Sequence, residues 1–92
     1  MKIEWTDEAL EDLERIYQFN ASINAQFAEK VVELLVKAPE LLLDTPQVGK
    51  RLDQYRPRHV RRILPENRFE MRYEVTATTI FIVRLWSTRE DR

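Results

Sequence analysis

The chain has 92 residues, 43% of them hydrophobic, and a formal net charge of −1 at pH 7. A chain of this length forms one small domain and buries only roughly two thirds of its unfolded surface. It contains no cysteine, which excludes disulfides and thiolate metal sites, so a partner protein is one way for it to gain further stability.

The N-terminal segment, residues 1–5, alternates polar and apolar side chains, which predicts a short strand with Ile3 and Trp5 facing inward. Lys2 and Glu4 interrupt any apolar run, so we do not interpret the segment as a signal peptide. No stretch approaches the roughly 18 apolar residues that a membrane-spanning helix needs. We therefore expect a cytoplasmic protein with no membrane association.

Two helices follow in the predicted order. Thr6 has the side chain of an N-cap, and the apolar residues of 7–20 recur at helical spacing. After a turn, a second apolar stripe extends from Phe27 to Ala38 and stops at Pro39, which lacks the N–H that a helix interior requires. Two helices joined by a brief turn predict a helical hairpin.

The second half of the chain changes its hydrophobic period from 3.6 to 2. The segment 46–49, Pro-Gln-Val-Gly, ends the helical part, and we expect 50–59 to be a polar loop. Strands are predicted at 60–64 and 69–75, the latter with one buried face, and a central strand begins at 80–83. In that last strand, alternation places Arg84 and Trp86 on the face of Ile80 and Ile82. Tyr73 alternates with Phe69 and Met71, so we expect it in the core.

The predicted element order, β-α-α-β-β-β, indicates an α+β fold. We expect an antiparallel sheet with the two-helix hairpin packed on one of its faces. No linker or internal repeat interrupts the pattern, so we expect residues 1–92 to form a single domain.

Charge is distributed unevenly, with acids dominating residues 1–20 and bases dominating residues 50–68. Successive strand residues point to opposite faces, so at most one of Arg61 and Arg62 shares a face with Arg84. One interpretation is an exposed cationic patch that meets an acidic protein surface. The other is structural, with the arginines paired to Glu70, Glu74, Glu90 or Asp91. The candidate binding residues are Arg58, Arg61, Arg62, Arg84 and Trp86, of which Trp86 is either an exposed interface anchor or, as we favour, part of the core edge.

Several other classes of function lack the residues that they require. One glycine cannot form a phosphate-cradling loop, and one histidine without cysteine leaves only scattered carboxylates for a metal. We therefore expect neither a cofactor nor a metal. The basic residues fall on a loop and strands rather than on a recognition helix, which argues against direct nucleic-acid binding.

Five segments together resemble the ParE/RelE superfamily of toxins from type II toxin–antitoxin pairs. They are residues 3–9 with Leu13, the Pro-x-x-Gly segment 46–49, the strand segment 60–63, the aromatic strand 69–75 and the last-strand segment 80–84. Each segment is weak alone, but their order and spacing cover nearly the whole chain. Arg61 matches the arginine of the family's second-strand motif better than Arg62 does.

The resemblance implies a growth-arresting toxin that a cognate antitoxin neutralises in a hetero-oligomer. RelE-like members cleave messenger RNA in the ribosome, whereas ParE-like members act on DNA gyrase. Metal-free RNA cleavage needs a general base and an acid, and the nuclease branch usually has a histidine or tyrosine near the last strand. Residues 84–89 contain neither.

The ParE-like branch is therefore favoured, with gyrase inhibited by protein contact and no catalytic residue assigned. Two alternatives remain open: a ribosome-dependent endoribonuclease using His59 or Tyr55, and a non-toxic relic that only binds antitoxin. The residues leave the choice between gyrase and ribosome unsettled.

Overall fold

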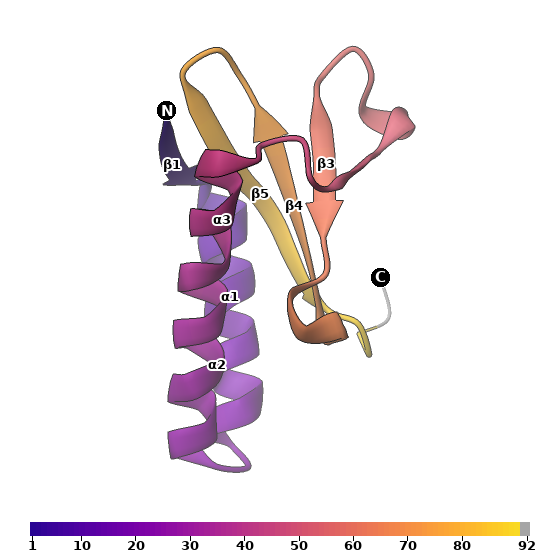
Figure 1. Cartoon of the computed structure of the whole chain (residues 1–92). Helices are drawn as coiled ribbons and strands as arrows, with labels where there is room; N and C mark the ends of the chain where they lie inside the picture. Colours follow the sequence, from indigo (N-terminus) through magenta and orange to yellow (C-terminus); the bar gives the residue numbers. More distant parts are fainter. Residues whose placement is uncertain (91–92) are drawn as a thin grey trace.

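The computed structural model describes residues 1–90 and consists of a helical hairpin packed on a five-stranded sheet (Figure 1). Short 3-10 turns, labelled η, connect several of the elements. The elements are β1 (Lys2–Trp5), α1 (Asp7–Ala21), α2 (Ala25–Lys37), η1 (Ala38–Glu40), α3 (Leu41–Asp44), β2 (Lys50–Arg51), η2 (Asp53–Tyr55), β3 (Val60–Ile63), η3 (Pro65–Asn67), β4 (Phe69–Val75) and β5 (Thr79–Ser87).

Side-chain caps fix where the two long helices begin. The Thr6 hydroxyl accepts a hydrogen bond from the Ala9 amide at 3.1 Å, and the Asn24 side chain accepts one from the Phe27 amide at 3.1 Å. α1 and α2 then run side by side on one face of the sheet (Figure 1). Within residues 1–90, no helix is long and apolar enough to cross a membrane.

The sheet has the order β1-β5-β4-β3-β2. Its β2–β3, β3–β4 and β4–β5 pairs are antiparallel, but β1 runs parallel to β5, with Ile3 opposite Ile80. The sheet is therefore mixed rather than wholly antiparallel, because alternation specifies which face of a strand is buried and not its direction. A two-residue strand, β2, also forms inside the segment 50–59 that we expected to be loop throughout.

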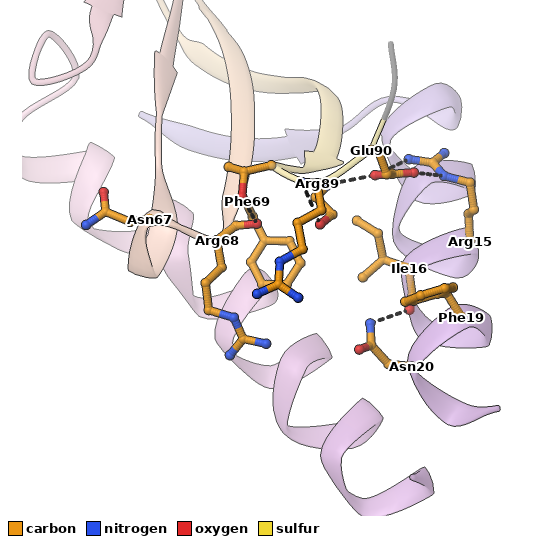
Figure 2. A pocket seen from close by; sticks show the side chains of 11 residues that line it. Arg15, Ile16, Phe19, Asn20, Asn67, Arg68, Phe69, Arg89 and Glu90 are labelled. Carbon is orange, nitrogen blue, oxygen red and sulfur yellow. Dashed lines mark hydrogen bonds and ion pairs between the residues drawn. The ribbon is translucent and has the colours of Figure 1, made fainter. Parts of the chain in front are cut away.

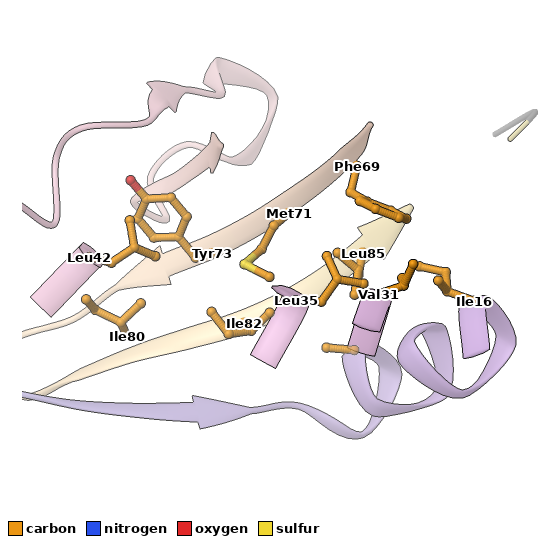
Figure 3. Close-up of a cluster of buried hydrophobic side chains, with 11 residues drawn as sticks. Ile16, Val31, Leu35, Leu42, Phe69, Met71, Tyr73, Ile80, Ile82 and Leu85 are labelled. Atoms are coloured by element: carbon orange, nitrogen blue, oxygen red, sulfur yellow. The ribbon is translucent and has the colours of Figure 1, made fainter. Parts of the chain in front are cut away.

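The core lies between the hairpin and the inner face of β4 and β5 (Figure 3). Tyr73 is fully buried there, as its alternation with Phe69 and Met71 predicted. Each such buried side chain contributes on the order of 2 kcal/mol of hydrophobic stabilisation, which holds the sheet rigid beneath its outer surface. The buried cluster includes Ile16, Val31, Leu35, Leu42, Phe69, Met71, Tyr73, Ile80, Ile82 and Leu85.

A β-bulge reverses the expected orientation of the last residues of β5. Tyr73 pairs with Ile82 but Arg72 pairs with Arg84, so Val83 is the extra residue between them. Ile82 and Leu85 are both buried in the core, and Arg84 lies on the opposite face. The prediction that Arg84 and Trp86 share a face with Ile80 and Ile82 is wrong, because one inserted residue inverts the alternation beyond it.

Candidate functional site

Three arginines form a row across the outer face of the sheet, the face away from the helices. Arg62 on β3 is the cross-strand partner of Arg72 on β4, and Arg72 is the partner of Arg84 on β5. Directly opposed residues on neighbouring strands point to the same face. We call Arg62, Arg72 and Arg84 the arginine row.

A buried carboxylate holds two members of the row in place. Glu70 is fully buried. Its Oε1 accepts a hydrogen bond from Arg62 at 3.3 Å, and its Oε2 accepts one from the Arg72 Nε at 2.7 Å. A buried carboxylate is costly unless it is paired, so the two guanidinium groups stay close to it.

Two aromatic rings pack against the row. The Trp86 centroid lies 4.6 Å from the guanidinium carbon of Arg72 and 4.8 Å from that of Arg84, within cation–π range. From η2, the Tyr55 hydroxyl accepts a hydrogen bond from Arg72 at 2.8 Å. Burial by itself would lower the pKa of Arg72, but the bonds to Glu70 and Tyr55 outweigh it and raise the pKa above its ordinary value.

Trp86 is therefore not part of the core edge, contrary to the interpretation that we favoured. It lies half-buried on the outer face and is absent from the buried core cluster. The bulge at Val83 is the cause, because without it Trp86 would point toward the helices.

The third arginine is held by α1. Arg84 donates from Nε to Asp12 Oδ2 at 2.8 Å and from Nη2 to Asp12 Oδ1 at 3.2 Å. The Asp12 carboxylate also accepts from Arg15 at 2.6 Å and from the Leu85 amide at 2.9 Å. Burial would raise the pKa of Asp12, but these hydrogen bonds more than offset it and hold the pKa below its usual range.

Arg61 lies on the other face and does not join the row. Its cross-strand partner is the buried Tyr73, and its Nη1 donates to the carbonyls of Gly49 at 2.6 Å and Gln47 at 3.0 Å. Its Nε donates to His59 Nε2 at 2.7 Å. Partial burial lowers the pKa of His59, as do the charges of Arg51 and Arg61, so the imidazole is neutral near pH 7.

The Pro-x-x-Gly segment, residues 46–49, is an anchor for the sheet. The Tyr73 hydroxyl donates to the Pro46 carbonyl at 2.8 Å and accepts from the Gly49 amide at 3.0 Å. A Cβ at Gly49 would meet the backbone carbonyl of Arg62 and would lie 2.6 Å from the Tyr73 hydroxyl. The chain's single glycine is therefore required by close packing.

The expected pairing of arginines with acids is realised in several places. Besides the Arg62–Glu70 pair, the exposed Arg58 pairs with Glu74 at 2.9 Å. Arg15 pairs with Glu90 at 2.8 Å. Asp91, the remaining acid that we considered, lies outside the described residues. The binding and structural interpretations are therefore compatible, because the arginines of the row are held by acids and still border solvent.

Sequence reasoning missed Arg72 and Asp12, and it considered Tyr55 only as a residue of the nuclease alternative. Alternation does place Arg72 outward on its strand, but only the register shows that it lies between Arg62 and Arg84. Tyr55 reaches the sheet from a segment without periodicity. Asp12 looked like one more acid on an exposed helix face.

The chemistry available on the outer face is cationic recognition. Guanidinium groups donate paired hydrogen bonds to carboxylates and phosphates, and their planar faces stack on aromatic rings. Within residues 1–90, no group of three or more histidine, cysteine or acidic side chains could hold a metal ion.

Comparison with known proteins identifies relatives over almost the whole chain. A family model described as the ParE toxin of the type II toxin–antitoxin system, parDE, matches residues 3–92. A solved structure described as the chromosomal ParDE TA system from P. aeruginosa is similar, with 26% sequence identity and a TM-score of 0.78. The alignment covers 95% of this chain and 95% of that chain. No curated protein matches at comparable significance.

Proposed function

The chain belongs to the ParE toxin family of type II toxin–antitoxin systems, and from that premise we propose that it inhibits DNA gyrase through the arginine row. In this proposal an antitoxin neutralises it in a cytoplasmic hetero-oligomer. The toxin acts by binding, and no covalent step on gyrase is involved.

The observation that carries the proposal is the arrangement of the row with Trp86. Arginine and tryptophan are the residues most enriched at the energetic centres of protein interfaces. Here Glu70 and Asp12 fix the arginines before any partner arrives, so little side-chain entropy is lost on binding. The surface suits an acidic patch on a protein target.

The hydrogen bonds on the outer face also favour binding over RNA cleavage. Among residues 1–90, Tyr55 is the titratable side chain that hydrogen-bonds to the row besides the paired acids, and its hydroxyl accepts from Arg72. His59 Nε2 accepts from Arg61, which is directed away from the row. In the described part of the chain, a general base and a general acid are not placed together beside the cations.

The direct test is a supercoiling assay with purified toxin and gyrase, with and without the antitoxin encoded beside it. We expect inhibition that rises with toxin concentration and that an equimolar amount of antitoxin relieves. A toxin that arrests growth without affecting supercoiling would contradict the gyrase proposal. Cleavage mapping of messenger RNA on ribosomes would then test Tyr55, whose hydroxyl lies beside Arg72.

A further inference from the structure

Three basic side chains lie together on the inner face of the sheet, at the edge that β2 forms. Arg51 on β2 is the cross-strand partner of Arg61 on β3, so the two side chains point to the same face. His59 precedes Arg61 by two residues, and its Nε2 accepts a hydrogen bond from the Arg61 Nε at 2.7 Å. All three residues are partly buried. We call Arg51, His59 and Arg61 the basic cluster.

The basic cluster differs from the arginine row because it contains no ion pair. Each arginine of the row pairs with Glu70 or Asp12. Arg51 and Arg61, in contrast, form no ion pair with any acid among residues 1–90. Like charges on directly opposed strand residues destabilise a sheet. The repulsion between these two guanidinium groups is therefore not offset by a carboxylate of the described chain.

The basic cluster also has hydrogen-bond donors without acceptors. The Arg51 Nε is buried and has no hydrogen-bond partner within residues 1–90, and leaving a buried donor unpaired is unfavourable. Arg61 uses its Nε and Nη1, whereas its Nη2 makes no hydrogen bond in the described part of the chain. Because the His59 Nε2 accepts a hydrogen bond, the neutral ring carries its proton on Nδ1, which is a further donor.

The two guanidinium groups both act on the His59 ring. Burial lowers the pKa of His59, and the charges of Arg51 and Arg61 lower it further. The three groups therefore lie close enough together to contact one small ligand. That ligand must be an anion, since the cluster offers positive charge and donors.

We propose that the basic cluster binds a phosphate group. A phosphate carries a charge of about −1.5 to −2 near pH 7, which matches two unpaired guanidinium groups, whereas a carboxylate offsets only one of them. Its acceptor oxygens suit donors that come from two arginines and an imidazole. The bound phosphate connects β2, an edge strand of two residues, to β3. The site depends neither on gyrase nor on the antitoxin.

Thermal melts and calorimetry on the purified toxin test the site. The probe is sodium phosphate, and sodium chloride at the same ionic strength is the reference. The test variant is Arg51→Gln. The matched control is Arg68→Gln, because Arg68 is exposed and forms no ion pair within residues 1–90. Arg68 lies beyond the other end of β3, where it lines a cavity together with residues of α1 (Figure 2).

Phosphate should raise the melting temperature of the unaltered toxin above its value in chloride, because a ligand of the folded state stabilises it. Arg51→Gln should weaken phosphate binding about tenfold and remove most of that rise, whereas Arg68→Gln should change Kd less than about twofold. In chloride, Arg51→Gln should melt no lower than the unaltered toxin, because it relieves the repulsion with Arg61. In NMR spectra, phosphate should shift the Arg51 Nε–Hε resonance and the resonances of the His59 ring.

Adenosine monophosphate and adenosine distinguish two sources of the phosphate group. Tighter binding of adenosine monophosphate than of inorganic phosphate would assign the site to a phosphate ester. Equal or weaker binding would assign it to free phosphate. In both cases Arg51→Gln should weaken the binding. Adenosine that bound as tightly as its monophosphate would contradict the inference, because the nucleoside and not the phosphate would then be recognised.

Three further results would overturn the inference. In the first, phosphate and chloride give the same melting temperature. In the second, Arg51→Gln and Arg68→Gln reduce the effect of phosphate equally, which would show a response to net charge and not to a site. In the third, Arg51→Gln lowers the melting temperature by the same amount in both salts, which would make Arg51 a structural residue. Acetate that bound as tightly as phosphate would reject phosphate as the class of ligand.

Discussion

The Asp12 carboxylate on α1 accepts a hydrogen bond from the Arg84 guanidinium on β5 at 2.8 Å, across 72 residues of sequence. β1 pairs with β5 only as far as Ile82, so no strand formed by residues 1–90 lies beside that edge of β5 beyond Ile82. Asp12 accepts from the Leu85 amide, and Arg15 donates to the Leu85 carbonyl at 3.2 Å. Asp12 and Arg15 therefore provide hydrogen-bond partners for the backbone of the exposed strand edge, and Asp12 also orients Arg84.

Replacing Asp12 with Asn should lower the free energy of unfolding at neutral pH by about 2 kcal/mol, because it removes a buried charge that two arginines share. Chemical denaturation measures the change. The matched control is Asp53→Asn, which removes an exposed acid paired with Arg56 and should cost less than about 1 kcal/mol. If Asp12→Asn and Asp53→Asn lowered the free energy of unfolding equally, the stabilising role of the Asp12 cluster, which consists of Asp12, Arg15 and Arg84, would be contradicted.

The same cluster predicts acid sensitivity. The folded-state pKa values of Asp12 and Glu90 lie below 3.8 and 4.5, their ordinary values. Each group therefore stabilises the fold fully above its ordinary pKa and loses that contribution as the pH falls through its folded pKa. Denaturation between about pH 6 and about pH 2 should show stability falling in this range. In Asp12→Asn the fall should be shallower, and an identical slope would exclude Asp12 as a contributor.

Replacing Tyr73 with Phe should cost about 2 kcal/mol while leaving the core filled. The loss comes from two hydrogen bonds, because the Gly49 amide loses its acceptor and the Pro46 carbonyl loses its donor. Hydrogen exchange should become faster at the Gly49 amide. Tyr17→Phe is the control, since the Tyr17 hydroxyl makes no hydrogen bond within residues 1–90, and its stability should change little.

The sequence was sufficient to predict the two long helices, four of the five strands and the buried face of β4, because hydrophobic periodicity reports burial directly. It was not sufficient for the site. The single extra residue at Val83 leaves no mark in the pattern, yet it moves Arg84 and Trp86 to the outer face beside Arg72. The direction of β1 relative to β5 could not be predicted either, since a strand of the same composition can pair parallel or antiparallel to its neighbour.

Arg61 illustrates the same limit. Its segment, residues 60–63, resembled a family motif, and Arg61 was one of the candidate binding residues. Only the register shows that it faces the Pro46–Gly49 segment and that Arg62 belongs to the row. Strand alternation showed that at most one of Arg61 and Arg62 can share a face with Arg84. The strand register then identified Arg62 as that residue.

Replacing Glu66 with Asn should stabilise the protein by about 0.5 kcal/mol. Glu66 and Asn67 have φ values of 57° and 55° in the turn between β3 and β4. Asn tolerates this left-handed conformation better than Glu. Glu66→Val is the matched opposite, because a β-branched side chain is strained there, and it should destabilise by about 1 kcal/mol. A higher melting temperature for Glu66→Val than for Glu66→Asn would contradict the turn geometry.

The outer face and the inner face of the sheet predict different phenotypes for Arg72 on β4 and Arg61 on β3. Arg72→Lys keeps the positive charge but loses the planar group that contacts Glu70, Tyr55 and Trp86. In the supercoiling assay it should raise the toxin concentration needed for half inhibition about tenfold, while antitoxin affinity is retained. Trp86→Ala should act in the same direction, because it removes the ring between Arg72 and Arg84.

Arg61→Ala should instead lower the melting temperature, because the carbonyls of Gln47 and Gly49 lose their donor. Per folded molecule, its inhibition of gyrase should remain close to that of the unaltered toxin. The melting temperature reports whether Arg61 holds the loop, and gyrase inhibition per folded molecule reports whether it binds the target. If Arg61→Ala lost inhibition at full stability while Arg72→Lys retained it, the binding surface would lie on the inner side of β3 and the arginine row would be structural only.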